Sequence, residues 1–209
     1  MTILLSDPRV HAVPVRECGE PLVTLGPAYG PARARVRTGL ARRLARAAAA
    51  LPAGVGLRVV EGHRSVADQR AIVARYAAEV RAAHPHADAR EVERLTSRFV
   101  APVAVAPHVA GAAVDLTLVD AAGRLLDLGT PIDATPEQSG GRCYFDAPGI
   151  SPRARAHRAL LAAVLTPEGF VNYPTEWWHW SHGDQYWALA TGVGAAMYGP
   201  VGSAAGAAA

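Results

Sequence analysis

Three side chains in this sequence, His108, Asp115 and His179, are of the types that hold zinc in catalytic sites. His108 and Asp115 are seven residues apart in P-H-V-A-G-A-A-V-D, and His179 follows Glu176 by three in E-W-W-H-W. Two imidazoles and one carboxylate would leave the fourth position of a tetrahedral zinc site open to water. We therefore predict one zinc ion per chain, held by these three residues.

Glu176 is the candidate general base, because a carboxylate beside the metal can take a proton from a metal-activated water and pass it to the leaving amine. In a flat strand, residues three apart face opposite sides, so the chain must bend or bulge between Glu176 and His179. Arg64 would stand at a strand end and supply a fixed positive donor for a developing oxyanion. The three tryptophans of E-W-W-H-W would wall the cleft or pack behind it.

Other assignments stay open at this point. His182, three residues after His179, is a rival third ligand, and His84 and His86 offer a second metal pair. Taken singly, His108 also fits an ordinary loop histidine. The remaining histidines are interpreted as structural: His11, His63 and His157.

The elements that position these residues follow from periodicity and capping signals. Apolar residues at three-to-four spacing, Ser or Asp caps and proline stops predict helices over 31–51, 66–83, 88–99 and 151–165. Apolar and β-branched runs predict strands over 55–61, 112–119, 125–128, 175–181 and 185–191, with a long Gly- and Pro-rich loop at 129–152. Gly111 would let the chain bend between a loop histidine and a strand aspartate.

Helices and strands do not alternate strictly, so we predict a single α+β domain with a mostly antiparallel central sheet flanked by helices. The domain is expected to span 1–200, with a flexible tail at 201–209. The net charge of +3 is small, and the arginines of 33–46 have no interleaved aromatic residues. They fit a solvated helix face better than a phosphate-binding one, so no nucleic-acid partner is expected.

The sequence begins without a basic region before its apolar residues, and no apolar run is long enough to span a bilayer. We therefore expect no signal peptide, no membrane partner and a cytoplasmic location. Cys18 and Cys143 are interpreted as two buried thiols in a reducing compartment, with one long-range disulfide as the alternative.

The combined motifs resemble the VanX-type zinc D-alanyl-D-alanine dipeptidases, which are related to the zinc D,D-carboxypeptidases of peptidoglycan. The resemblance runs from about Gly56 to Trp187 and leaves residues 1–50 poorly matched. It rests on G-H-R at Arg64, on H-V-A-G-A-A-V-D-L-T-L, on D-L-G-T-P-I-D and on G-F-x-x-Y-x-x-E-W-W-H-W. The resemblance implies the same three zinc ligands, Glu176 as base and Arg64 as a catalytic residue. It further implies that Asp133 holds the free ammonium of the substrate.

Three positions depart from the family pattern. Ala106 stands where the family usually has Ser, Ser65 follows the arginine in place of Pro, and Val109-Ala110 stands where an Arg is common. The missing serine and arginine would alter polar contacts around the substrate while leaving the metal ligands intact.

The sequence therefore predicts a zinc metallopeptidase that hydrolyses a free dipeptide, with D-Ala-D-Ala as the first choice. One alternative is a D,D- or L,D-carboxypeptidase that acts on longer peptidoglycan peptides. Another is a non-catalytic zinc domain that binds peptides. The oligomeric state does not follow from the sequence.

Overall fold

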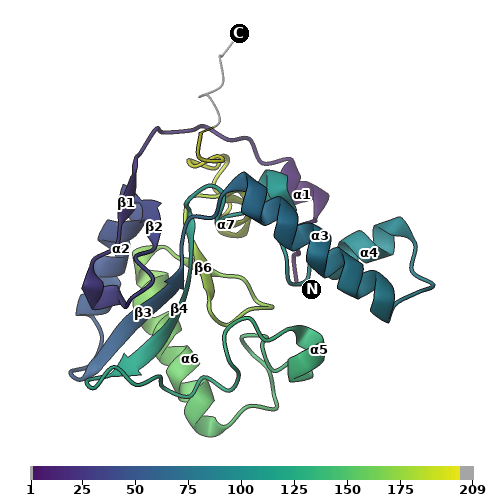
Figure 1. The fold of residues 1–209 in the computed structure, drawn as a ribbon. Helices are drawn as coiled ribbons and strands as arrows, with labels where there is room; N and C mark the ends of the chain where they lie inside the picture. Colours follow the sequence, from purple (N-terminus) through teal and green to yellow (C-terminus); the bar gives the residue numbers. More distant parts are fainter. Residues whose placement is uncertain (1, 203–209) are drawn as a thin grey trace. The chain divides into compact units, whose positions relative to one another are not determined.

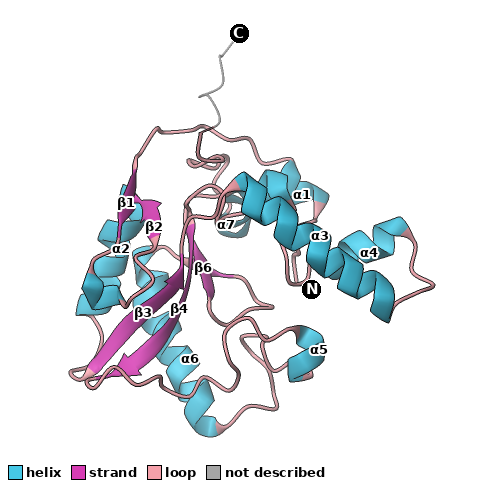
Figure 2. Cartoon of the chain, viewed as in Figure 1, coloured by secondary structure: helices cyan, strands magenta, loops and turns pink. Residues whose placement is uncertain are grey.

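The computed structural model describes residues 2–202, and Figures 1 and 2 show its helices and strands. These residues divide into two packed units, each built from several chain segments. The first unit comprises the described parts of Met1–Gly19, Arg64–Gly111 and Gly183–Ala209. The second unit comprises Glu20–His63 and Ala112–His182.

A four-stranded antiparallel sheet forms the centre of the second unit. Its strand order is β3 (Val55–Glu61), β4 (Ala113–Asp120), β6 (His179–Ser181) and β5 (Val171–Asn172). The first six residues of β4 are all buried, because β4 has a strand on each side and is covered by packed side chains. This burial explains the near-continuous apolar run that predicted the strand.

Helix α6 (Pro152–Leu165) packs against β4 and against helix α2 (Thr38–Ala49). The hydroxyl of Ser151 accepts a hydrogen bond from the N–H of Ala154, so this side chain caps α6 as the sequence predicts. The long loop that precedes α6 contains the single-turn helix α5 (Pro136–Ser139). Two arginines of α2 bind Glu168: Arg43 donates to its carbonyl and Arg46 to its carboxylate.

The predicted helix start near residue 31 is wrong. Residues Arg35–Arg37 form strand β2, which pairs with β1 (Leu22–Thr24) in a separate two-stranded antiparallel sheet. Val36 is fully buried, and the apolar side chain between two arginines follows the polar–apolar alternation of a strand, although Arg37 is buried too. Helix α2 therefore begins at Thr38.

The first unit is mainly helical. Helices α3 (Val66–Ala83) and α4 (Ala89–Thr96) pack against each other around a core that contains Tyr76, Val80 and Val92. Ser65 caps α3 by accepting a hydrogen bond from the N–H of Asp68. The remaining helices of this unit are α1 (Pro8–His11) and α7 (Gln185–Thr191), which contact each other.

The strand predicted at 185–191 is wrong, because these residues form helix α7. Gly183 has a positive φ of 86° and turns the chain out of strand β6. The side chain of Asp184 then accepts a hydrogen bond from the N–H of Trp187, which caps the new helix.

The predicted α+β class with an antiparallel central sheet is confirmed. Three 3-10 helices complete the described elements: Pro27–Tyr29, Val103–Val105 and Thr166–Glu168. The residue bounds of the domain stay a prediction, and residues 203–209 of the predicted tail lie outside the described residues.

Gly62 directly follows β3, and the path of the chain there requires a residue without a Cβ atom. The register between β3 and β4 shifts between Val59 and Glu61, and the chain then runs past the backbone of Arg35. A Cβ atom at Gly62 would lie 2.5 Å from the carbonyl oxygen of Arg35. Only glycine fits here without movement of that backbone, and Arg64 follows two residues later.

We expect Gly62→Ala to lower the free energy of unfolding by about 1–3 kcal/mol, the usual cost of overpacking a buried site. Gly26→Ala is the matched control, because a Cβ at Gly26 has no atom within 4 Å. The control should stay within about 1 kcal/mol of the parent. Urea unfolding of both variants is the measurement, and equal stability of the two would contradict the close approach.

Candidate metal centre and active site

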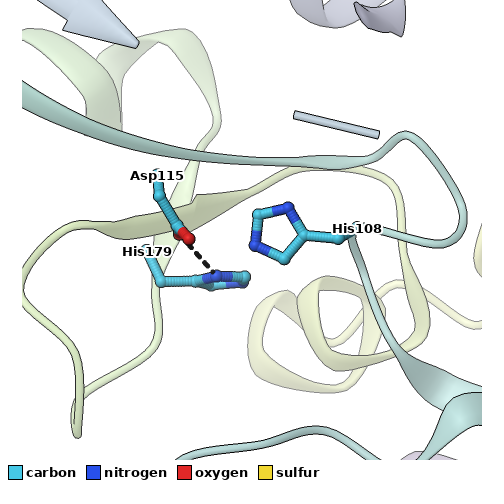
Figure 3. A group of neighbouring side chains, drawn as sticks. All are labelled: His108, Asp115 and His179. Carbon is cyan, nitrogen blue, oxygen red and sulfur yellow. Dashed lines mark hydrogen bonds and ion pairs between the residues drawn. The ribbon is translucent and has the colours of Figure 1, made fainter. Parts of the chain in front are cut away.

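The structure brings together the three predicted metal ligands. One donor atom from each of His108, Asp115 and His179 lies within 4.8 Å of the other two, and Figure 3 shows the three side chains directed toward one another. All three side chains are buried. This is the one group of metal-ligand type found among residues 2–202.

Pairing of β4 with β6 places two of these ligands side by side. Asp115 and His179 are direct partners in the antiparallel register, so their side chains leave the sheet on the same face. Nδ1 of His179 lies 3.1 Å from Oδ1 of Asp115. His108 reaches β4 through a turn in which Gly111, with φ of 66°, donates its N–H to the carbonyl of His108. The predicted bend at this glycine is therefore present.

These donors fit a zinc ion. Catalytic zinc takes three protein ligands of histidine or carboxylate type and keeps the fourth position open. A buried carboxylate is costly in free energy unless positive charge or hydrogen-bond donors face it, and a divalent cation meets that requirement for Asp115. The fit rests on donor chemistry, burial and mutual distance together.

Glu176 reaches this group through a tight turn rather than a bulge. Residues 174–178 leave the strand geometry, and the N–H of His179 donates to the carbonyl of Glu176 at 3.2 Å. The turn brings Oε2 of Glu176 to 3.9 Å from Nδ1 of His179. Glu176 is itself buried. Glu176 therefore lies beside His179 but is not a member of the three-residue group.

The three tryptophans of the motif pack behind the turn. Trp177, Trp178 and Trp180 are at most 2% exposed. The indole N–H of Trp177 donates to the hydroxyl of Thr130, and that of Trp180 donates to the carbonyl of Trp177. Of the two predicted roles, packing behind the site is therefore the one that the structure supports.

Arg64 follows β3 in a stretch that contacts His108 through the backbone. Its N–H donates to the carbonyl of His108 at 3.1 Å. Its guanidinium donates to Oε1 of Gln69, and Nε2 of Gln69 donates to the carbonyl of Ala101. Gln69 is 1% exposed, so it holds the arginine side chain from a fixed position. Gln69 was not predicted as a site residue; its signal would have been a polar residue at a buried helix position.

Asp133 lies outside the three-ligand group. It is exposed and adopts a positive φ of 63°, which is strained for a residue other than glycine. It lines a hollow of about 370 Å³ in the second unit. The other residues that line this hollow are Gly129, Thr130, Pro131, Ile132, Ala134, Gln138, Ser139 and Arg142.

Arg158 is a second buried polar residue that was not predicted from the sequence. It is 1% exposed, and its guanidinium donates four hydrogen bonds to backbone carbonyls of the loop before α6. The guanidinium carbon also lies 5.6 Å from the ring centre of Trp177. Burial lowers the pKa of Arg158 to about 10, which still leaves it charged at neutral pH. The sequence contains many arginines and no lysine, and no motif distinguishes Arg158 from the other arginines.

The rival histidine ligands are placed elsewhere. Nδ1 of His182 lies 2.9 Å from the carbonyl oxygen of Gly169, and burial lowers the pKa of this histidine. His84 and His86 line a hollow of about 320 Å³ with Glu91. Neither set belongs to the three-ligand group. Both cysteines are free thiols. Cys143 is buried as predicted, whereas the prediction that Cys18 is buried is wrong, because this residue is exposed.

Comparison with known proteins decides the family. A family model described as Peptidase M15, D-ala-D-ala dipeptidase, matches residues 28–192. The chain belongs to this family. The resemblance predicted from the motifs is therefore confirmed, and the match begins well before Gly56, where those motifs start. The protein is an enzyme of the zinc-dependent dipeptidase type, and its cofactor is zinc.

Two relatives show the extent of the similarity. A D-alanyl-D-alanine dipeptidase of Synechocystis is 29% identical over 216 residues, which cover 85% of this chain and 87% of the relative. A D-alanyl-D-alanine dipeptidase of Escherichia coli is 43% identical over 72 residues, covering 34% of this chain and 35% of the relative.

A solved structure, VanYB in complex with D-alanine-D-alanine, is similar in fold. It is 19% identical, with a TM-score of 0.50 over 78% of this chain and 77% of that chain. At this identity the likeness concerns the fold alone.

Among residues 2–202, no helix is both long and apolar enough to cross a membrane.

We expect the parent to bind about one zinc per chain and His179→Ala to bind it at least about 100-fold more weakly, because a ligand is lost. His182→Ala should retain the zinc, although loss of its contact with Gly169 lowers stability by about 1–3 kcal/mol. Metal analysis after dialysis against a weak chelator measures both. If the His179 variant retained zinc and the His182 variant lost it, the third ligand would be His182 and not His179.

Proposed function

We propose that this protein is a zinc metallopeptidase that hydrolyses a free dipeptide, most favourably D-Ala-D-Ala. The observation that carries the proposal is the position of Glu176, whose carboxylate lies 3.9 Å from His179 beside a buried three-ligand group. A structural metal site has no need of a buried carboxylate that is not a ligand. The family match supports the same activity, and its relatives carry the name D-alanyl-D-alanine dipeptidase.

In this mechanism His108, Asp115 and His179 hold the metal. Zinc, when bound, supplies a Lewis acid that lowers the pKa of water and polarises a carbonyl group. Glu176 takes the proton from the attacking water and delivers it to the leaving amine. The buried tryptophans behind the turn exclude water, which strengthens the electrostatic effect of each charged group in the site.

Arg64 would stabilise the oxyanion that develops on the scissile carbonyl. A guanidinium remains charged throughout catalysis, and Gln69 holds this one by a 2.7 Å hydrogen bond. A donor that is fixed before the reaction costs no reorganisation when charge develops. This role is inferred from the matching motif and from the link between Arg64 and His108.

Asp133 would bind the free ammonium group of the dipeptide. Its strained φ is typical of residues at functional sites, where the surrounding structure maintains an unfavourable backbone conformation. A carboxylate at this position favours a charged amino terminus and disfavours peptides that are extended beyond it. The proposed enzyme is therefore a dipeptidase rather than a peptidase of long chains.

Three alternatives remain as outcomes of the tests. One is a D,D- or L,D-carboxypeptidase that acts on longer peptidoglycan peptides. The buried alanine at position 106 lacks the hydroxyl that the family usually has, which permits a dipeptide other than D-Ala-D-Ala. A non-catalytic zinc domain is less well supported, because Glu176 is retained. The cytoplasmic location stays a prediction.

Glu176→Gln should lower kcat for D-Ala-D-Ala by about 10²- to 10⁴-fold, because an amide cannot accept the proton. Zinc content should stay at the parental value, since Glu176 is not a ligand. The matched control is Glu137→Gln, an exposed glutamate of α5. Activity of the Glu176 variant within a few-fold of the parent would exclude Glu176 as the base.

Asp133→Asn should raise KM for the free dipeptide by about 10- to 100-fold, the loss expected for one charge-assisted contact, and change kcat little. An N-acylated tripeptide should be a poor substrate for the parent and should be less affected by the substitution. Steady-state kinetics with both substrates measure this. Faster cleavage of the acylated tripeptide by the parent would favour the carboxypeptidase alternative.

A further inference from the structure

The turn between β5 and β6 carries the base and one metal ligand, and its geometry involves a side chain that no motif assigned. Asn172 is the last residue of β5 and pairs with Trp180 of β6. Its side-chain Nδ2 donates to the carbonyl oxygens of Glu176 and His179, both at 2.9 Å. A longer contact of 3.4 Å reaches the carbonyl of Trp177.

These hydrogen bonds add to those that the backbone already makes. The carbonyl of Glu176 accepts from the N–H of His179, and the carbonyl of His179 accepts from the N–H of Tyr173. Each carbonyl has two lone pairs, so the two protons of the Asn172 amide fill the remaining positions. The separation of the Glu176 and His179 backbones is thereby fixed from inside the turn.

We propose that Asn172 is a positioning residue that sets the distance between the base Glu176 and the metal ligand His179. The inference rests on the proposed hydrolytic function and deepens it. Asn172 acts through the backbone of the turn. A half-buried amide with both protons engaged has no spare donor for a substrate.

The role requires the amide protons of asparagine, which neither aspartate nor alanine can supply. Aspartate has nearly the same shape, but as a carboxylate it has no protons to donate, and it would face three carbonyl oxygens. Alanine removes the donors without adding charge. Asn172→Asp should therefore displace the turn strongly, and Asn172→Ala should loosen it.

The test compares both variants with the parent zinc protein. For D-Ala-D-Ala, kcat should fall by about 100-fold or more in Asn172→Asp and by about 10-fold or more in Asn172→Ala, with KM within about threefold. Zinc affinity, measured by chelator competition, should weaken by about 10- to 100-fold in Asn172→Asp, the usual effect of losing support behind a ligand. The visible spectrum of the cobalt-substituted protein should change as well.

Gln185→Glu is the matched control. Nε2 of Gln185 also donates to two backbone carbonyls, those of Val10 and Val13, in the other unit. The control removes the same kind of amide clamp, so it should lower stability by a comparable amount. Its kcat, zinc affinity and cobalt spectrum should remain parental, which separates positioning from a general loss of stability.

A measurement on the parent covers the case in which both Asn172 variants fail to fold. Asn172 is the sole asparagine of the sequence, so selective ¹⁵N labelling of asparagine side chains gives one pair of amide proton signals. Both protons should be protected from exchange with solvent. A rapidly exchanging pair, or Asn172→Asp with parental kcat and zinc affinity, would overturn the proposal.

If the parent hydrolyses no dipeptide, the proposed function fails, and zinc affinity and the cobalt spectrum alone decide the role of Asn172.

Discussion

The antiparallel register of β4 with β6 is the constraint on which the rest of the site depends. It places Asp115 opposite His179, with the carboxylate 3.1 Å from the imidazole. A slip of one residue would turn each side chain to the other face of the sheet. The buried pairs Ala113–Ser181 and Val114–Trp180 belong to the same register, so a slip would also displace these packed side chains.

The turn before β6 brings a second carboxylate, that of Glu176, beside this pair. A regular strand would direct Glu176 and His179 to opposite faces, whereas the turn brings their side chains within 3.9 Å. Packing supports the turn from behind, where the guanidinium of Arg158 lies over Trp177 and bonds to the loop that also carries Thr130 and Asp133. The loop and the turn are therefore held by the same buried cation.

The metal-ligand residues could be predicted from the sequence, because their types and their spacing in the chain already indicate a metal site. His108 and Asp115 are close in the chain, and an aspartate inside an apolar strand already requires a positive partner. The supporting hydrogen bonds could not be predicted, because Gln69 and Arg158 act on residues distant in the chain. The strand predicted at 185–191 failed for a local reason, since Asp184 caps a helix that the apolar residues alone did not reveal.

The most direct test of this account is a zinc titration of the metal-free protein with D-Ala-D-Ala hydrolysis as the readout. Because one three-ligand group holds the metal, the rate should rise linearly and reach its plateau at about one zinc per chain. Hydrolysis at the full rate before zinc is added, or no hydrolysis of the dipeptide at saturating zinc, would contradict it.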